Sequence, residues 1–88
     1  MDEKELEKIL KALANRRRLL ILKILKKKKK VSMGNMSGLI KLSFRSTSKH
    51  FTVLYAAGIV EKEQDGLTMY YSLSSKLPKI TSSVLSII

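Results

Sequence analysis

The lysines and arginines of this chain are the residues whose type and spacing indicate what the protein binds. Residues 8 to 60 contain fourteen Lys or Arg and no Asp or Glu, and the whole chain carries a net charge of +11. Ammonium and guanidinium groups at this density repel one another, and they bind phosphate groups well because binding releases condensed counterions. The span therefore predicts a polyanionic partner, with nucleic acid first. Lysines that only keep the protein in solution are the alternative.

Other chemistries lack the side chains that they need. The chain has no Cys and one His, so it cannot form a disulfide or assemble a His/Cys metal site within one chain. Its seven Asp and Glu lie in two separate clusters, at residues 2–7 and 61–65, which offer no nucleophile with a base and no paired carboxylates in a cleft. We expect no catalytic residue, no metal, no cofactor and no enzymatic activity.

Length and hydropathy limit the architecture. The 88 residues, 44% of them hydrophobic, predict one folded domain over residues 1–88, and a core this small gains stability from dimer formation. We expect no signal peptide, because the first residues are acidic, and the longest apolar run, residues 19–22, is too short to cross a bilayer. A cytoplasmic, nucleoid-associated protein without membrane contact is the expectation.

The spacing of apolar residues predicts two helices in the first third of the chain. The first covers residues 3–14, and its apolar side consists of Leu6, Ile9, Leu10 and Leu13. The second covers residues 16–28, follows the N-cap residue Asn15, and is apolar enough to be the central helix. Arginines occupy residues 16–18 at its N-terminus, where the helix dipole disfavours cations, so we expect phosphate contacts there.

Two further helices are predicted in the middle of the chain. A short extended piece near Val31–Ser32 precedes a helix over residues 33–41. Ser43 is a good N-cap for a helix over residues 44–57, which Gly58 is placed to stop. The two helices are separated by a tight turn.

A hairpin and a closing helix complete the predicted order. Alternating residues over 59–73, with a turn at Asp65-Gly66, predict a β-hairpin. Pro78 can start a last helix over residues 78–88, whose apolar side consists of Ile80, Val84, Ile87 and Ile88. Two short helices joined by a tight turn and followed by a hairpin form the winged helix-turn-helix plan. The fold class is mainly α with a small β-hairpin wing (α+β).

The predicted helix over residues 44–57 has one side suited to a DNA groove. On a helical wheel its core side consists of Thr47, Phe51, Leu54 and Tyr55. The opposite arc consists of Arg45, Ser48, Lys49, Thr52 and Ala56. Arginine and lysine there can donate to guanine O6 and N7 or to phosphates, whereas the hydroxyl groups bond more weakly. An ordinary solvated helix face is the alternative.

Two aromatic residues of this helix are less clear-cut. Phe44 falls near the core side, which favours packing in the first turn over a ring placed against thymine methyl groups. His50 lies between the two faces, where a phosphate contact is favoured over a metal. The side chains predicted to contact DNA are Arg16, Arg17, Lys27, Lys28, Lys29, Phe44, Arg45, Ser46, Ser48, Lys49, His50 and Thr52.

Three stretches of the sequence match segments of one known family. Residues 13–22 read LANRRRLLIL, similar to LA(N/D)xxRLxIL. Residues 42–60 read LSFRSTSKHFTVL and then YAAGIV, similar to LSQSTVSRHLKVL and REAGLV, and residues 65–73 read DGLTMYYSL, similar to DGRxxYYxL. With these segments the chain resembles the arsenic-repressor (ArsR-type) family of winged helix-turn-helix transcriptional regulators, over about residues 6 to 73.

The resemblance implies a site and a partner. It implies that the family's DNA-facing positions are Phe44, Arg45, Ser48, Lys49 and His50. It also implies a homodimer built from the first and last helices, whose interface would consist of Leu6, Ile9, Leu10, Leu13, Ile80, Val84, Ile87 and Ile88.

The chain also departs from the family pattern. Residues 33–36 lack the Cys-x-Cys pair through which many members sense metals, and residues 78–88 lack carboxylate and His ligands. Phe44 stands where a polar residue is usual, the wing residues 61–65 are net acidic, and glycines weaken the helix over residues 33–41. We therefore expect no metal sensing.

Three functions fit the sequence to different degrees. The favoured one is sequence-preferring binding of double-stranded DNA by a homodimeric, repressor-like transcriptional regulator. A non-specific, chromatin-like protein that coats DNA fits the charge equally well. A winged-helix docking module for other proteins fits the apolar residues 84–88, but it does not explain the acid-free span.

Overall fold

Five helices and a three-stranded antiparallel sheet make up the fold. The structure, a computed structural model, describes residues 1–88. The elements are α1 (Glu3–Leu13), α2 (Arg16–Lys28), β1 (Lys30–Ser32), α3 (Met33–Ile40), α4 (Phe44–Ala56), β2 (Val60–Asp65), β3 (Thr68–Leu73) and α5 (Lys79–Leu85). None of the helices combines the length and the apolar character needed to span a membrane. The architecture is the predicted winged helix-turn-helix.

Side-chain caps explain where the helices begin. The side chains of Asp2, Asn15, Ser32 and Ser43 each accept a hydrogen bond from a backbone N–H in the first turn of α1 to α4. These four helices begin at the predicted residues. The closing helix differs, because α5 covers only Lys79–Leu85 and Pro78 precedes it as its N-cap residue.

The sheet contains one strand more than the predicted hairpin. β1 pairs with β3, with Val31 opposite Tyr71, so the strand order is β1-β3-β2. Asp65 pairs with Thr68, and the two-residue turn is therefore Gly66-Leu67, one residue later than predicted. Gly66 has a φ of 63°, a value that glycine tolerates at the first position of a tight hairpin turn.

The core is built around α2 and α4. Ile21, Leu22 and Leu25 of α2 are fully buried, as is Phe51 of α4. The Phe51 ring stacks on Tyr71 of β3 with centroids 3.7 Å apart and planes 6° apart. Loss of a buried Phe side chain costs about 3–5 kcal/mol. This stack fixes α4 against the sheet that forms the wing.

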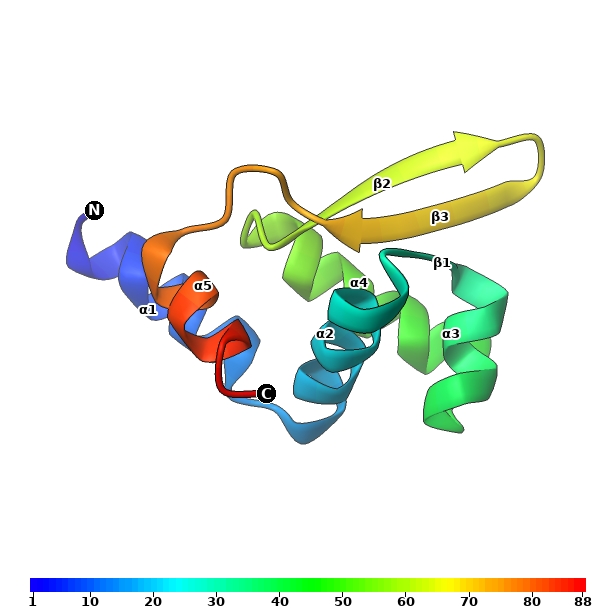
Figure 1. Cartoon of the computed structure of the whole chain (residues 1–88), viewed down its shortest axis with the longest axis horizontal. Helices are drawn as coiled ribbons and strands as arrows, with labels where there is room; N and C mark the ends of the chain where they lie inside the picture. The colour runs from blue at the N-terminus through cyan, green and yellow to red at the C-terminus, as the bar shows by residue number, and fades with distance from the viewer.

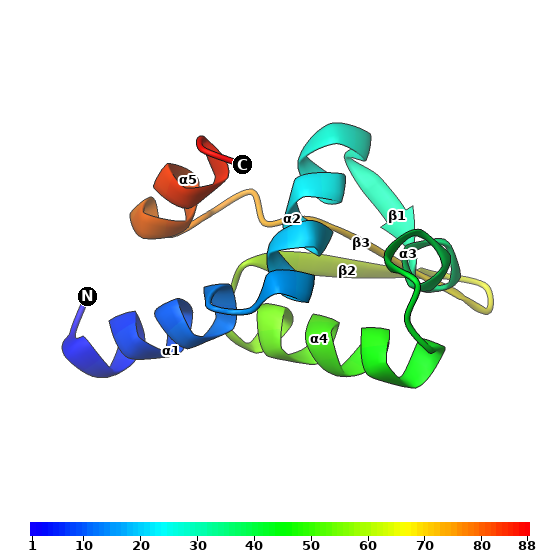
Figure 2. The same cartoon turned by 90° about the horizontal axis from the view of Figure 1, so that it is seen from below.

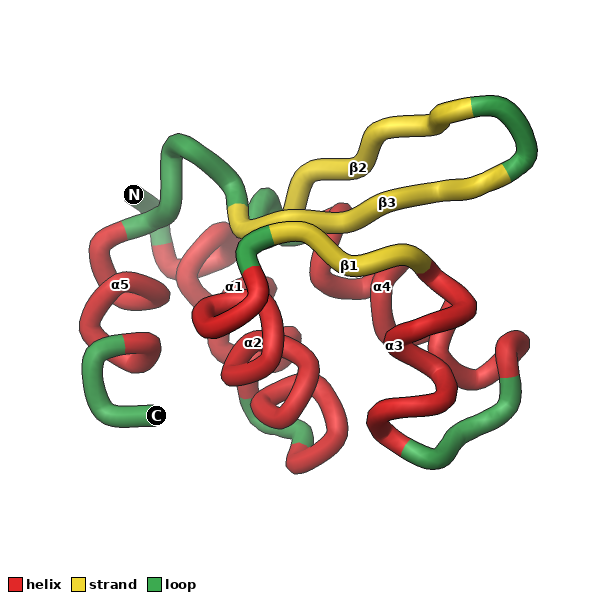
Figure 3. Tube along the Cα trace, turned by 45° about the vertical axis from the view of Figure 1, so that its right-hand side comes forward, coloured by secondary structure: helices red, strands yellow, loops and turns green.

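The figures show how the elements are distributed in space. The strands lie together on one side of the helices, and the hairpin of β2 and β3 extends away from α1 and α5 (Figures 1 and 3). α2 begins beside α4 and runs away from it, so its C-terminus lies on the opposite side of the molecule (Figure 2). The fold thus separates the two ends of α2.

Two fully buried threonines differ in their hydrogen bonding. The Thr47 hydroxyl on α4 donates to the Ser43 carbonyl oxygen at 2.9 Å. The Thr81 hydroxyl on α5 has no hydrogen-bond partner. A buried hydroxyl without a partner lowers stability, because it loses its bonds to water and gains none.

Thr81→Val is expected to raise the free energy of unfolding by about 1 kcal/mol, because a methyl group replaces an unpaired hydroxyl. Thr47→Val is the matched control and is expected to lower that free energy by about 1 kcal/mol, because it removes a hydrogen bond. Urea denaturation at one protein concentration measures both variants. A loss of stability in both variants would contradict the conclusion that the Thr47 hydroxyl has a hydrogen-bond partner and the Thr81 hydroxyl has none.

Candidate nucleic-acid interface

The outer face of α4 is exposed and has no acidic residue. Arg45, Lys49 and Thr52 are exposed, and Ser48 beside them is half-buried. The predicted core residues Thr47, Phe51 and Leu54 are fully buried. The 3.6-residue period therefore placed the basic side of this helix correctly.

Tyr55 is not part of the core, which makes that prediction wrong. Its side chain is 47% exposed, and the Lys62 ammonium lies 4.4 Å from its ring centroid. Tyr55 is at the edge of the buried arc, and the exposed strand β2 lies next to it. A cation–π contact with the wing therefore replaces the predicted burial.

Phe44 is also exposed, contrary to the prediction that it packs in the first turn. Its exposed fraction is 63%, because no other element covers the start of α4 on that side. The ring lines an open groove together with Leu67 and Met69 of the wing hairpin. Phe44 is therefore an apolar surface residue beside the wing.

The turn before α4 adds one cation that sequence reasoning missed. Lys41 is exposed and has a φ of 56°, the left-handed conformation that closes α3. Ser43 then caps α4, accepting from the Ser46 backbone N–H at 3.0 Å, and its hydroxyl lies 3.1 Å from the Ser46 hydroxyl. The signal for Lys41 was its position in the turn, two residues before the cap residue Ser43.

Two of the three arginines at the start of α2 bind other helices. The Arg18 guanidinium donates to the carbonyl oxygens of Lys11 at 2.9 Å and Ala12 at 2.6 Å, at the end of α1. Arg17 donates to the carbonyl oxygen of Ile40, the last residue of α3, at 2.8 Å. Arg17 thereby caps α3 with one of its N–H groups, but its side chain is exposed like that of Arg16, which makes no such bond. A phosphate contact by Arg17 therefore stays a prediction.

His50 is held by the same guanidinium. Arg18 Nη1 lies 3.3 Å from His50 Nδ1. A guanidinium only donates, so Nδ1 accepts, and we assign the ring proton to Nε2. Burial first, and then the charges of Arg18 and Arg17, lower the pKa of His50 below its ordinary value. The ring is neutral and keeps one free N–H donor.

The lysines predicted to bind DNA are separated from α4. Lys27, Lys28 and Lys29 are exposed at the C-terminus of α2, on the side of the molecule opposite α4 (Figure 2). At 1.5 Å per residue, the axial distance from Arg16 to Lys28 is about 18 Å. The structure thus brings Arg16, but not the lysine run, to the side of α4.

Comparisons with known proteins agree with this geometry. The chain is 37% identical over 82 residues to the transcriptional activator HlyU of Vibrio cholerae, covering 85% of this chain and 75% of HlyU. The chain belongs to the ArsR-type family of winged helix-turn-helix transcriptional regulators. A solved structure of that HlyU matches this ArsR-type chain with a TM-score of 0.81 at 30% identity, covering 99% of this chain and 92% of that chain.

Another solved structure supports the fold of this ArsR-type chain. It is the homodimeric winged helix-turn-helix DNA-binding domain Mb0332 from Mycobacterium bovis, with a TM-score of 0.81 at 23% identity, covering 96% of this chain and 74% of that chain. No protein-family model matches the chain. The predicted family resemblance is confirmed.

Two of the three acidic residues in the wing of this ArsR-type chain bind its own donors. Glu63 pairs with Lys30 at 2.7 Å, and this bond lowers the pKa of Glu63. Glu61 accepts from the backbone N–H of Ser75 at 3.0 Å, which lowers the pKa of Glu61. The Lys30 ammonium therefore offsets the charge of Glu63, whereas the lowered pKa of Glu61 keeps that carboxylate ionised and negative.

The predicted dimer surface is only partly on the surface. Ile9 and Leu13 are buried in the core of their own chain, so their assignment to a dimer interface is wrong. The remaining predicted residues are exposed (Leu6, Leu10, Ile87) or half-buried against the core (Ile80, Val84, Ile88). α1 and α5 lie at one end of the molecule, away from the tip of the wing (Figure 1).

His50 gives a prediction about pH, because it is the only histidine. Its pKa in the folded chain lies below the ordinary value of 6.5, so the unfolded chain binds more protons in acid. This contribution to stability is full above that value and is lost as the pH falls from it through the folded pKa. Urea denaturation is expected to show less stability at pH 5.5 than at 7.5.

The control for this prediction is His50→Gln, which is expected to remove most of the pH dependence in that window. NMR titration of the His50 ring measures the pKa directly. A folded-state pKa above 6.5 would contradict the assignment of Nδ1 as the acceptor from Arg18.

Proposed function

We propose that this protein is a homodimeric, repressor-like transcriptional regulator that binds double-stranded DNA with sequence preference and senses no metal. The exposed basic face of α4 is the observation that carries this proposal. α4 is the second helix of the helix-turn-helix, the position that enters the major groove. The proposal includes a location in the cytoplasm, at the nucleoid, and no enzymatic activity.

The proposed contacts to DNA are of two kinds, contacts to bases and contacts to phosphates. Arg45 and Lys49 project from α4 and donate to guanine O6 and N7, with Ser48 and Thr52 adding weaker bonds. Phe44, exposed at the start of α4, meets the methyl groups of thymine. Phosphate contacts are assigned to Arg16, Lys41, Ser46 and the free Nε2–H of His50.

The internal bonds of several cations favour sequence preference over non-specific coating. Of the fourteen cations in residues 8 to 60, Arg17, Arg18 and Lys26 donate to backbone carbonyls, Lys30 pairs with Glu63, and Lys11 pairs with Glu7. These five cations have partners within the chain. The charge available to coat DNA is therefore smaller than the composition indicates, and the ordered α4 face carries more of the binding.

Arg45→Ala is expected to weaken binding to the preferred site by about 1–3 kcal/mol and to relax the choice of base at one position. The preferred site is first found by selection from a random duplex pool. Fluorescence anisotropy then compares the variant with Lys4→Ala, a control that removes one exposed charge from α1. Equal losses on preferred and random duplexes would show general coating instead.

The end formed by α1 and α5 supports the homodimer. Leu6, Leu10 and Ile87 are exposed there, although each is a large apolar side chain. A second copy that covers them removes this surface from water, at about 25 cal/mol per Å². The small core gives the chain a further reason to associate.

Leu10→Asp is expected to convert the dimer to a monomer, because the charge would be buried in the interface without a partner. Leu39→Asp is the matched control, since Leu39 on α3 is 47% exposed and Leu10 is 44% exposed. Light scattering gives the mass of each variant. A dimeric Leu10→Asp variant with native circular dichroism would remove α1 from the interface.

A further inference from the structure

The end of α2 opposite α4 carries a group of lysines that the proposed contacts do not use. We name Lys27, Lys28 and Lys29 the distal lysine cluster. All three are exposed, and none makes a hydrogen bond or ion pair with another side chain. Their neighbours differ, because Lys26 donates to the Leu85 carbonyl oxygen at 2.7 Å and Lys30 pairs with Glu63.

Helix capping does not explain three lysines at this position. The macrodipole of α2 attracts cations to its last turn, but that effect is small and is screened by salt. Lys26 already stands in this turn, and Lys29 closes the helix through its backbone N–H to Leu25 rather than through its ammonium group. Three consecutive unpaired ammonium groups repel one another, so a polyanion is the partner that relieves the repulsion.

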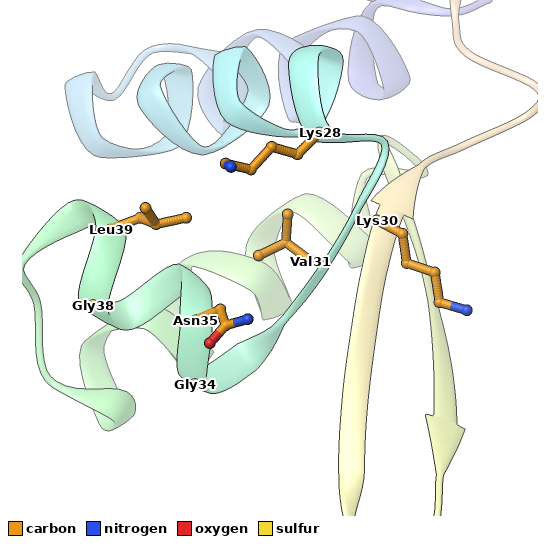
Figure 4. A pocket seen from close by; sticks show the side chains of 7 residues that line it. All are labelled: Lys28, Lys30, Val31, Gly34, Asn35, Gly38 and Leu39. Carbon is orange, nitrogen blue, oxygen red and sulfur yellow. The ribbon is translucent and has the colours of Figure 1, made fainter.

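The surface beside the cluster allows an extended strand of phosphates to approach. An open pocket of about 660 Å³ lies between α2, β1 and α3. Figure 4 shows Lys28 extending over this pocket from α2 and Asn35 facing it from α3, whereas Lys30 extends away along the hairpin. Gly34 and Gly38 line the pocket, and a Cβ added to either would meet nothing within 4 Å.

We propose that the distal lysine cluster binds the phosphate backbone of a second DNA duplex, so that one dimer bridges two duplexes. This inference rests on the proposed function, because the first duplex occupies the α4 side. The two sides face away from each other (Figure 2). A duplex on α4 is therefore out of reach of the cluster.

Duplex DNA fits the cluster better than an acidic peptide does. Lys27 and Lys28 are successive residues of α2 and point about 100° apart, and Lys29 leaves the helix with a φ of 73°, so the three ammonium groups spread apart instead of converging on one carboxylate. Hydrated ammonium groups on flexible stems suit a row of phosphates without base recognition. The second duplex is accordingly expected to be bound without sequence preference.

The experiment measures capture of a second duplex. A bead-bound duplex with the complete preferred site occupies both α4 helices of the dimer, and a labelled duplex of unrelated sequence is added. The triple variant Lys27→Gln, Lys28→Gln and Lys29→Gln is expected to capture at least about tenfold less labelled duplex. The slope of the logarithm of the capture constant against the logarithm of the salt concentration is expected to be shallower by about 2.7, because three phosphate contacts are lost.

Controls separate this inference from the proposed function. The triple variant Lys4→Gln, Lys8→Gln and Lys76→Gln loses the same charge from exposed positions elsewhere and is expected to capture normally. Affinity of the distal variant for a single preferred duplex, measured by anisotropy, is expected to stay within about twofold of the wild type. If the wild type binds no duplex at all, the proposed function fails together with the inference.

Three results would overturn the inference alone. The first is normal capture by the distal variant. The second is an equal loss of single-duplex affinity, which would place the cluster on the first duplex. The third concerns competitors added to the wild-type protein. If polyglutamate abolishes capture of the labelled duplex and an excess of unlabelled, unrelated duplex does not, the partner of the cluster is an acidic polypeptide.

Discussion

Cations of α2 bind the C-termini of three other helices, and the arrangement of the fold depends on these bonds. The carbonyl groups at a helix C-terminus lack partners and carry partial negative charge. The α2 residues that bind them are Arg18 at the end of α1, Arg17 at Ile40 of α3, and Lys26 at Leu85 of α5. One central helix thereby sets the positions of the helix-turn-helix and of the two helices assigned to the dimer.

Arg18 also connects this arrangement to the site. The same guanidinium that closes α1 contacts His50 on α4, and Phe51, the next residue, stacks on Tyr71 of the sheet. α4 is thus held from one side by Arg18 of α2, which also binds the end of α1, and from the other side by the sheet. In a dimer through α1 and α5, these contacts fix the distance between the two recognition helices, which must match about 34–36 Å for adjacent major grooves.

Local patterns were enough to predict most elements, because periodicity and capping act within a few residues. Ser43 as the cap of α4 and the burial of Thr47, Phe51 and Leu54 are examples, and they are as predicted. The misassigned residues depend on distant parts of the chain. Phe44 and Tyr55 lie at the edges of the buried arc, where the neighbouring element decides exposure, and the pairing of β1 with β3 joins residues about forty positions apart.

Net charge indicated the class of partner but not the position of the contacts. The arginines at the start of α2 oppose its dipole, and the sequence offered phosphate as their compensation. For Arg17 and Arg18 the compensation is the negative ends of α3 and α1, which only the folded chain brings within reach. A basic run on a helix that crosses the molecule is divided between opposite faces. The number of cations in such a sequence therefore overestimates the charge that one face offers to a polyanion. Cations bonded within the chain must first be subtracted, and each remaining cation must be assigned to the face on which it lies.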